Sequence, residues 1–142
     1  MRPEAIFAPL CVLAFWTGFV LLLTGFRRLR AVARGRAPAG AFRFGESAEV
    51  PADVTVVNRN LMNLLEMPLL FYVVAIAFYV TRQVGPRPLV LAWIYVGLRL
   101  VHSFIHLTYN RVGHRLVVFA LSNFVLLTLW IWFASRVLGG VH

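Results

Sequence analysis

Three polar side chains share one face of a predicted helix in the middle of the chain. Arg59, Asn63 and Glu66 follow one another at i, i+4 and i+7, and an apolar run continues from them to Val80. Charged and amide groups are costly in an apolar segment of this length unless they meet polar partners. The spacing therefore predicts that these side chains face polar groups from other parts of the chain, or a bound ligand.

A second polar face occurs in the next apolar stretch. Arg99, His102 and His106 lie at i, i+3 and i+7. Arg115 follows at the predicted start of the last helix, where a cation opposes the helix dipole and needs a nearby anion. We expect Arg99 to pair with Glu66. Several arginines with few acids indicate an anionic or carboxylate-bearing ligand.

The spacing of His102 and His106 also fits two metal ligands on one helix face. No cysteine, aspartate or third histidine lies close enough in the sequence to complete a site. We therefore predict no metal site and assign the two histidines to hydrogen bonding. A metal-dependent membrane oxidase stays open as a minor alternative, which metal analysis tests.

The composition is that of an integral membrane protein. Hydrophobic residues make up 61% of the 142 residues, against roughly 45–50% in soluble domains. The net charge is +9, and the chain has arginines but no lysine. Because the arginines gather mainly in short gaps between apolar runs, we attribute most of them to membrane topology and anionic headgroups, and we expect no nucleic-acid binding.

Four apolar stretches are long enough to cross a membrane as helices, which takes about 20 residues each. We predict spans at about 5–29, 52–81, 88–110 and 114–137, within a single transmembrane domain covering 1–142. One medium connection, at about 30–51, and two short ones predict an all-α up-down-up-down bundle. This topology brings both polar faces, and the Arg27-Arg28 pair that closes the first span, to one end of the bundle.

The distribution of arginines predicts the orientation. The first and third connections carry six arginines between positions 27 and 43, together with Arg111 and Arg115. The opposite side has four arginines: Arg2, Arg82, Arg87 and Arg136. We therefore expect the 30–51 connection in the cytoplasm and both termini on the non-cytoplasmic side. In a bacterium, the membrane is expected to be the inner, or plasma, membrane.

The polar motifs resemble those of the MAPEG superfamily, the membrane-associated proteins in eicosanoid and glutathione metabolism. The family's second helix carries R-x-H/Q-x-N-x-x-E followed by a proline, and its third carries R-x-x-H/Y-x-x-x-Y. An arginine opens the fourth helix, and a double arginine closes the first. The matching residues here are Arg59, Asn63, Glu66 and Pro68, then Arg99, His102 and His106, then Arg115, and Arg27-Arg28.

The resemblance implies a homotrimer of four-helix subunits, with glutathione bound between neighbouring subunits near the cytoplasmic face. Arg115 would stabilise the glutathione thiolate, and His106 would be the second catalytic residue. A lipophilic small molecule would arrive from the bilayer and be conjugated, or a peroxide would be reduced. The implied glutathione-binding residues are Arg28, Arg59, Asn63, Glu66, Arg99 and His102.

The proline after Glu66 comes earlier than in the family's pattern, and Thr55-Val56 replaces an E-R pair expected before Arg59. Three further departures are single residues. Leu61 replaces a histidine or glutamine, His106 replaces a tyrosine that contacts the thiol, and Leu116 replaces a serine found in one branch. Two hypotheses follow. The first is a glutathione-dependent transferase or peroxidase, supported by the retained arginines, asparagine and glutamate. The second is a non-catalytic membrane module of the same fold that binds a lipid or a lipid-like anion.

Overall fold

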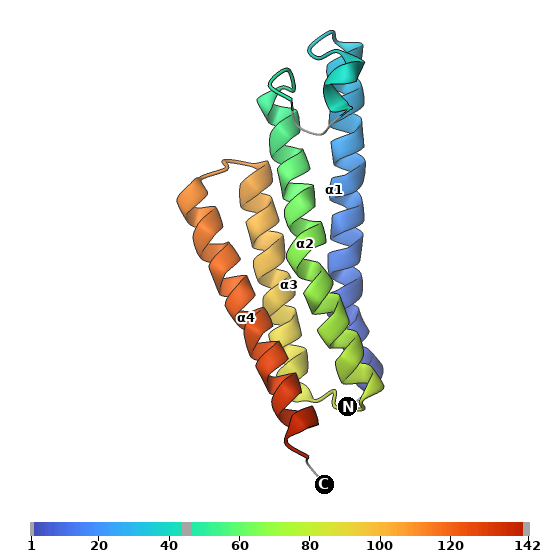
Figure 1. Ribbon diagram of the computed structural model, residues 1–142, viewed down its shortest axis with the longest axis vertical. Helices are drawn as coiled ribbons and strands as arrows, with labels where there is room; N and C mark the ends of the chain where they lie inside the picture. The colour runs from blue at the N-terminus through green and yellow to red at the C-terminus, as the bar shows by residue number, and fades with distance from the viewer. Residues whose placement is uncertain (1, 44–46, 141–142) are drawn as a thin grey trace.

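The computed structural model describes residues 2–43 and 47–140, so positions 44–46 of the expected 30–51 connection lie outside the described residues. Its long helices run alternately up and down (Figure 1) and are α1 (Phe7–Ala33), α2 (Ala52–Val80), α3 (Pro86–Leu107) and α4 (Val112–Leu138). Two short 3-10 helices flank α1: η1 (Pro3–Ile6) and η2 (Ala39–Phe42). The predicted all-α four-helix bundle is confirmed.

All four long helices are long and apolar enough to span a membrane. At about 1.5 Å per residue, the shortest of them, α3, reaches about 33 Å, against a hydrocarbon core of about 30 Å. Large apolar side chains such as Phe15, Leu22 and Phe124 point outward, as expected for a surface in contact with lipid. The chain is therefore a multi-pass integral membrane protein.

The helix ends explain where the predicted spans need correction. The third span was expected to continue to 110, but α3 ends at Leu107 because Asn110 takes a left-handed backbone conformation with φ of 47°. The N–H of Asn110 donates to the carbonyl of Ile105 over 2.8 Å, which closes the helix. The same helix starts at Pro86, two positions before the expected 88, since proline suits the first turn.

The core runs along α2, which contacts each of the other three long helices. Leu64, Phe71 and Phe78 repeat every seven residues on its inner face and are fully buried. The ring of Phe71 stacks on that of Tyr95 from α3, with centroids 4.7 Å apart. In Figure 1, α1 and α4 lie at opposite sides of the bundle, and both termini lie at the same end.

Candidate functional site

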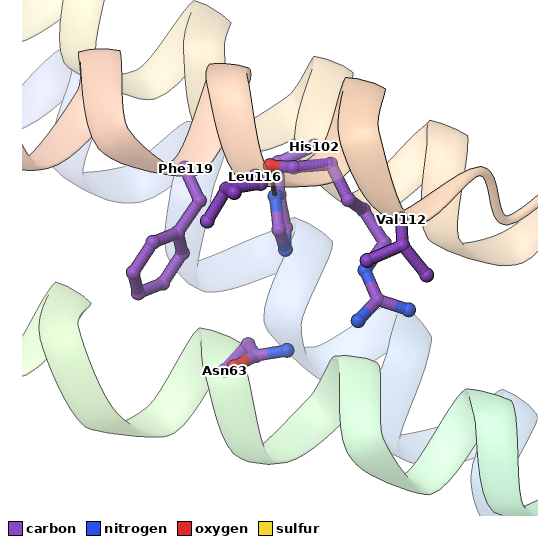
Figure 2. Close-up of a pocket in the computed structure, with 6 residues that line it drawn as sticks. Asn63, His102, Val112, Leu116 and Phe119 are labelled. Carbon is purple, nitrogen blue, oxygen red and sulfur yellow. Dashed lines mark hydrogen bonds between the residues drawn. The ribbon is translucent and has the colours of Figure 1, made fainter.

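A cleft opens between α2 and α4 toward the end of the bundle opposite the termini. It has a volume of about 200 Å³ and is hereafter called the polar cleft. Figure 2 shows Asn63 projecting from α2 toward His102 of α3, with side chains of α4 completing the cleft. Its lining residues are Asn63, His102, Val112, Arg115, Leu116 and Phe119. Three of the residues predicted to form the site, Asn63, His102 and Arg115, thus lie together.

Two contacts hold Arg115 at the mouth of this cleft. Its Nη1 donates a hydrogen bond of 2.5 Å to the side-chain oxygen of Asn110. Its backbone carbonyl lies 3.2 Å from Nδ1 of His102. Because a carbonyl only accepts hydrogen bonds, Nδ1 of His102 carries the proton in this contact and Nε2 is left as an acceptor. That buried Nε2 has no hydrogen-bond partner among the described residues.

Arg99 is completely buried beneath the polar cleft, with 0% of its surface exposed. Its Nε donates to the hydroxyl of Tyr95 over 3.0 Å, and its Nη2 donates to Oδ1 of Asn123 over 2.6 Å. Its guanidinium also lies over the rings of Tyr95 and Phe119, at 5.3 and 5.0 Å from the centroids. Two aromatic faces, a hydroxyl and an amide therefore surround this cation.

The expected pairing of Arg99 with Glu66 is wrong. Glu66 is exposed on the outer face of α2, whereas the inner face carries Leu64 and Pro68. Glu66 lies two residues after Leu64, which rotates it about 200° around the helix axis and away from α3. Arg59, seven residues earlier on the same face as Glu66, is also exposed.

His106, the other predicted catalytic residue, is 1% exposed, and neither of its ring nitrogens has a hydrogen-bond partner in the described part of the chain. Its ring centroid is 5.9 Å from that of His102, in an edge-on arrangement. A buried imidazole without partners is costly. Nε2 of His102 and both ring nitrogens of His106 are therefore left to bond other groups next to the polar cleft.

Arg28, an implied glutathione-binding residue, is not among the residues that line the polar cleft of the single chain. Its Nη2 donates to Oδ1 of Asn58 over 2.7 Å, and its guanidinium lies 5.6 Å from the ring centroid of Phe42. These contacts tie the end of α1 to the start of α2 and to η2. The reason is geometric: α1 packs on α2 and α3, on the side away from α4.

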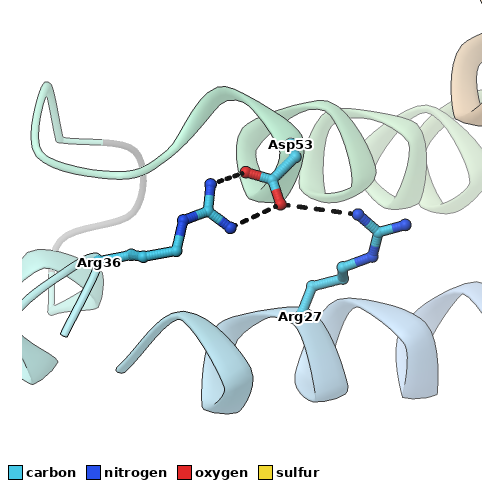
Figure 3. A network of polar contacts seen from close by, with 3 residues as sticks. All are labelled: Arg27, Arg36 and Asp53. Carbon is cyan, nitrogen blue, oxygen red and sulfur yellow. Dashed lines mark hydrogen bonds and ion pairs between the residues drawn. The ribbon is translucent and has the colours of Figure 1, made fainter. Parts of the chain in front are cut away.

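Two further basic residues at this end, Arg27 and Arg36, belong to a separate network around Asp53 (Figure 3). Arg36 donates to both carboxylate oxygens over 2.7 and 3.2 Å, and Arg27 lies 3.6 Å from one of them. The hydrogen bond to Asp53 raises the pKa of the Arg36 guanidinium above its ordinary value. Gly35, at φ of 64°, ends α1 and turns the chain so that Arg36 can reach back.

A buried hydrogen-bond network that the sequence did not reveal links three helices. The hydroxyl oxygen of Ser103 accepts hydrogen bonds from Nε1 of Trp16 over 2.8 Å and from Nδ2 of Asn60 over 2.7 Å. Asn60 and Ser103 are fully buried. The available signal was an amide inside one apolar span and a hydroxyl inside the next, since such groups join helices in membranes.

Among residues 2–43 and 47–140, no group of three or more His, Cys, Asp or Glu side chains is placed to hold a metal ion. His114, the third histidine of the described chain, instead has its Nδ1 3.3 Å from the hydroxyl of Tyr109.

These features define a class: a four-helix integral membrane protein with an arginine-bearing cleft at one end of the bundle. The sequence profile of the MAPEG family matches residues 6–135, which extend from η1 into the last turns of α4. The chain belongs to the MAPEG family, and the family predicted from the polar motifs is confirmed. Neither curated proteins nor solved structures gave a match.

Proposed function

We propose that the chain binds glutathione at the polar cleft and joins the whole tripeptide, through its sulfur, to a lipophilic electrophile from the bilayer. The cleft carries the proposal, because Asn63, His102 and Arg115 supply an amide, an imidazole and a guanidinium with no carboxylate among the lining residues. A ligand with carboxylate and thiolate groups complements this set. Membership of the MAPEG family supports the same choice.

The wall contributed by α4 suits the second substrate. Val112, Leu116 and Phe119 give the polar cleft an apolar side. Val112 and Leu116 are largely exposed on the outer surface of the bundle. A polar tripeptide from water and an apolar electrophile from lipid can therefore meet at one place.

In the proposed reaction, the guanidinium of Arg115 stabilises the glutathione thiolate relative to the thiol. The thiol proton passes to water, or through water to the imidazole of His106, which is buried behind the cleft lining. The thiolate sulfur then attacks the electrophilic carbon, a C–S bond forms, and the leaving group departs with its bonding electrons. With a lipid hydroperoxide, the sulfur attacks the O–O bond and releases the alcohol, and a second glutathione converts the sulfenic acid to the disulfide and water.

We extend the proposal to the assembly, a homotrimer whose subunit boundaries lie along the outer face of α2. Arg59 and Glu66 are exposed on this face within a candidate membrane span. Charged side chains facing lipid at that position are costly. A second copy of the chain would cover them and enclose glutathione between the two subunits, where Arg59 and Glu66 would contact its charged ends.

In this proposal, Arg28 and Arg99 support the site rather than line it, since each already has partners within its own chain. The arginine excess at the cleft end supports an orientation with this end in the cytoplasm and both termini on the other side of the membrane.

One observation favours a second candidate, a lipid-binding module without catalysis. Leu116, at the start of α4, lines the polar cleft next to Arg115 and adds apolar rather than hydrogen-bonding surface. An anionic lipid with its headgroup at Arg115 would use this surface. Tightly held lipid in native mass spectra, without conjugation of a general aryl halide, would favour this module.

The direct test is calorimetric titration of the detergent-purified protein with glutathione, followed by conjugation assays on two variants. Removing the guanidinium in Arg115→Ala should lower kcat about 100-fold while KM for glutathione changes less than about threefold, since the thiolate is stabilised mainly in the reaction. Arg111→Ala is the matched control: it removes an exposed arginine from the same connection, outside the cleft lining.

Two results would contradict the proposal. If titration to millimolar glutathione gives no heat of binding, glutathione is not the ligand. Equal losses in binding and turnover in Arg115→Ala, or equal losses in both variants, remove the catalytic role of Arg115.

A further inference from the structure

A pair of arginines lies over one tryptophan at the end of the bundle that holds both termini. The guanidinium carbon of Arg87 is 5.4 Å from the ring centroid of Trp132, and that of Arg136 is 6.0 Å from it. Within residues 2–43 and 47–140, neither guanidinium has a carboxylate or hydrogen-bond partner. Stacking on the ring therefore fixes two positive charges close together and leaves their N–H groups available.

The position of Arg87 on its helix makes this charge unfavourable without an anion. Arg87 is the second residue of α3, where the helix dipole is positive, and the N-cap residue Gly85 provides no side-chain hydrogen bond. Arg136 lies in the last turn of α4, where the dipole favours a cation. Arg136 adds its charge near the N-terminus of α3. The site therefore combines the charges of Arg87 and Arg136 with the positive end of the α3 dipole.

Next to the arginines, the surface is hollowed in two adjoining parts, which together are called the arginine groove. One part, of about 270 Å³, lies between Gln83, Arg87 and Arg136. The other, of about 450 Å³, is lined by apolar and small side chains, including Val90, Leu91 and Thr128 of the facing helices. Arg87 and Trp132 line both parts. The groove thus has a cationic part that continues into an apolar part.

We propose that the arginine groove binds an anionic glycerophospholipid from the leaflet at the termini end of the bundle. The phosphate would accept hydrogen bonds from Arg87 and Arg136, and an acyl chain would lie along Val90 and Leu91. Because the cationic part of the groove adjoins its apolar part, the groove favours an amphiphile over a soluble anion. This site lies at the opposite end of the bundle from the polar cleft, so it is independent of the proposed conjugation.

One further atom indicates the kind of headgroup. Oε1 of Gln83 is buried without a hydrogen-bond partner in the described part of the chain, and Gln83 lines the cationic part of the groove. The side-chain amide of Gln83, half-buried beside two cations, suits a headgroup that carries a hydroxyl as well as a phosphate. Phosphatidylglycerol has both groups and is the probe of choice.

The experiment measures lipid binding to the full chain by native mass spectrometry, with phosphatidylglycerol or phosphatidylcholine titrated into detergent-purified protein. The wild-type chain should bind phosphatidylglycerol more tightly. The double variant Arg87→Gln/Arg136→Gln should weaken this binding about 25-fold, at about fivefold for each arginine. The control Arg2→Gln/Arg82→Gln removes two exposed arginines from the same end but outside the groove, and should stay within about twofold of the wild type.

Two additional probes separate the contribution of the apolar part of the groove from that of the two arginines. Val90→Trp keeps both arginines but fills the apolar part, so it should weaken phosphatidylglycerol binding as well. Glycerol phosphate, which lacks acyl chains, should compete poorly. A soluble headgroup that competes as well as the lipid would overturn the proposal, as would equal losses in the two double variants or no preference for the anionic lipid. Unchanged melting temperatures confirm that each variant is folded.

Discussion

At the residue scale, the most informative contact is the one between Asn110 and Arg115. Asn110 adopts φ of 47°, a conformation that asparagine tolerates better than most residues, and from there its side-chain oxygen reaches Nη1 of Arg115. The turn and the guanidinium are thus fixed by one side chain. Asn110 is a positioning residue for Arg115 if Arg115 stabilises a thiolate.

Substitutions at Asn110 separate these two roles. Asn110→Gly keeps the left-handed turn but removes the acceptor, so stability should hold while kcat for conjugation falls about 2- to 12-fold, which corresponds to a net hydrogen bond of roughly 0.5–1.5 kcal/mol. Asn110→Ala should also lose about 1 kcal/mol of stability, because alanine is strained at positive φ. Turnover, KM and melting temperature are measured for each variant. A fall in kcat for Ala but not for Gly would assign the effect to the backbone alone.

Arg99 gives a second prediction at this scale. Asn123→Leu removes the amide oxygen that accepts from Nη2 and leaves part of a buried cation without a partner. Equilibrium unfolding in mixed micelles should show a loss of about 1–3 kcal/mol. The double variant Arg99→Leu/Asn123→Leu should lose less than the sum of the two single variants, because the charge is removed with its partner. Additive losses would contradict this coupling.

The sequence identified Asn63, His102 and Arg115 as neighbours but misplaced the partner of Arg99. Spacing along one helix fixes which side chains share a face, and the predicted up-down topology brought His102, near the end of α3, close to Arg115, near the start of α4. It does not fix which face of the next helix lies opposite, since that depends on how far each helix is rotated in the bundle. An amide and two aromatic rings in contact with a buried cation leave no charge pattern that the sequence would reveal.

At the element scale, Ser103 joins α1, α2 and α3 through a single oxygen atom. Trp16 and Asn60 both donate to it, so the three helices are held in register at one level. The helices themselves were predictable because apolar length and proline positions determine them. Their mutual register was not, because hydrogen bonds between helices need the packed arrangement first.

Ser103→Ala should destabilise the bundle by about 1–3 kcal/mol, since the buried amide of Asn60 and the partly buried indole N–H of Trp16 lose their acceptor. Ser122→Ala is the matched control: Ser122 is equally buried at 0% exposure, but its hydroxyl donates to the carbonyl of Phe119 within α4. It should cost less than about 0.5 kcal/mol. Denaturant titration in mixed micelles compares the two, and equal losses would show that burial rather than the three-helix contact matters.

At the scale of the whole molecule, the single chain has two kinds of outer surface. The outer side of α4 exposes apolar residues such as Phe124, which suits lipid, whereas the outer face of α2 combines apolar Met62 with exposed Arg59 and Glu66. The exposed charges of the second face lie within a candidate membrane span. The proposed trimer resolves this difference, because subunit contacts would cover α2 and leave α4 to the bilayer.

Spin labels on the two faces test this arrangement. In a Cys11→Ser background, a label at Met62→Cys should show low oxygen accessibility in membranes without glutathione, and a label at Phe124→Cys should show high accessibility. The two native side chains are 47% and 69% exposed in the single chain, so both labels would be accessible in a monomer. Dissociation in dodecyl sulfate should raise the value at position 62 alone. High accessibility at both positions in membranes would mean that the charged face of α2 meets lipid directly, and the site would then have to be completed within one chain.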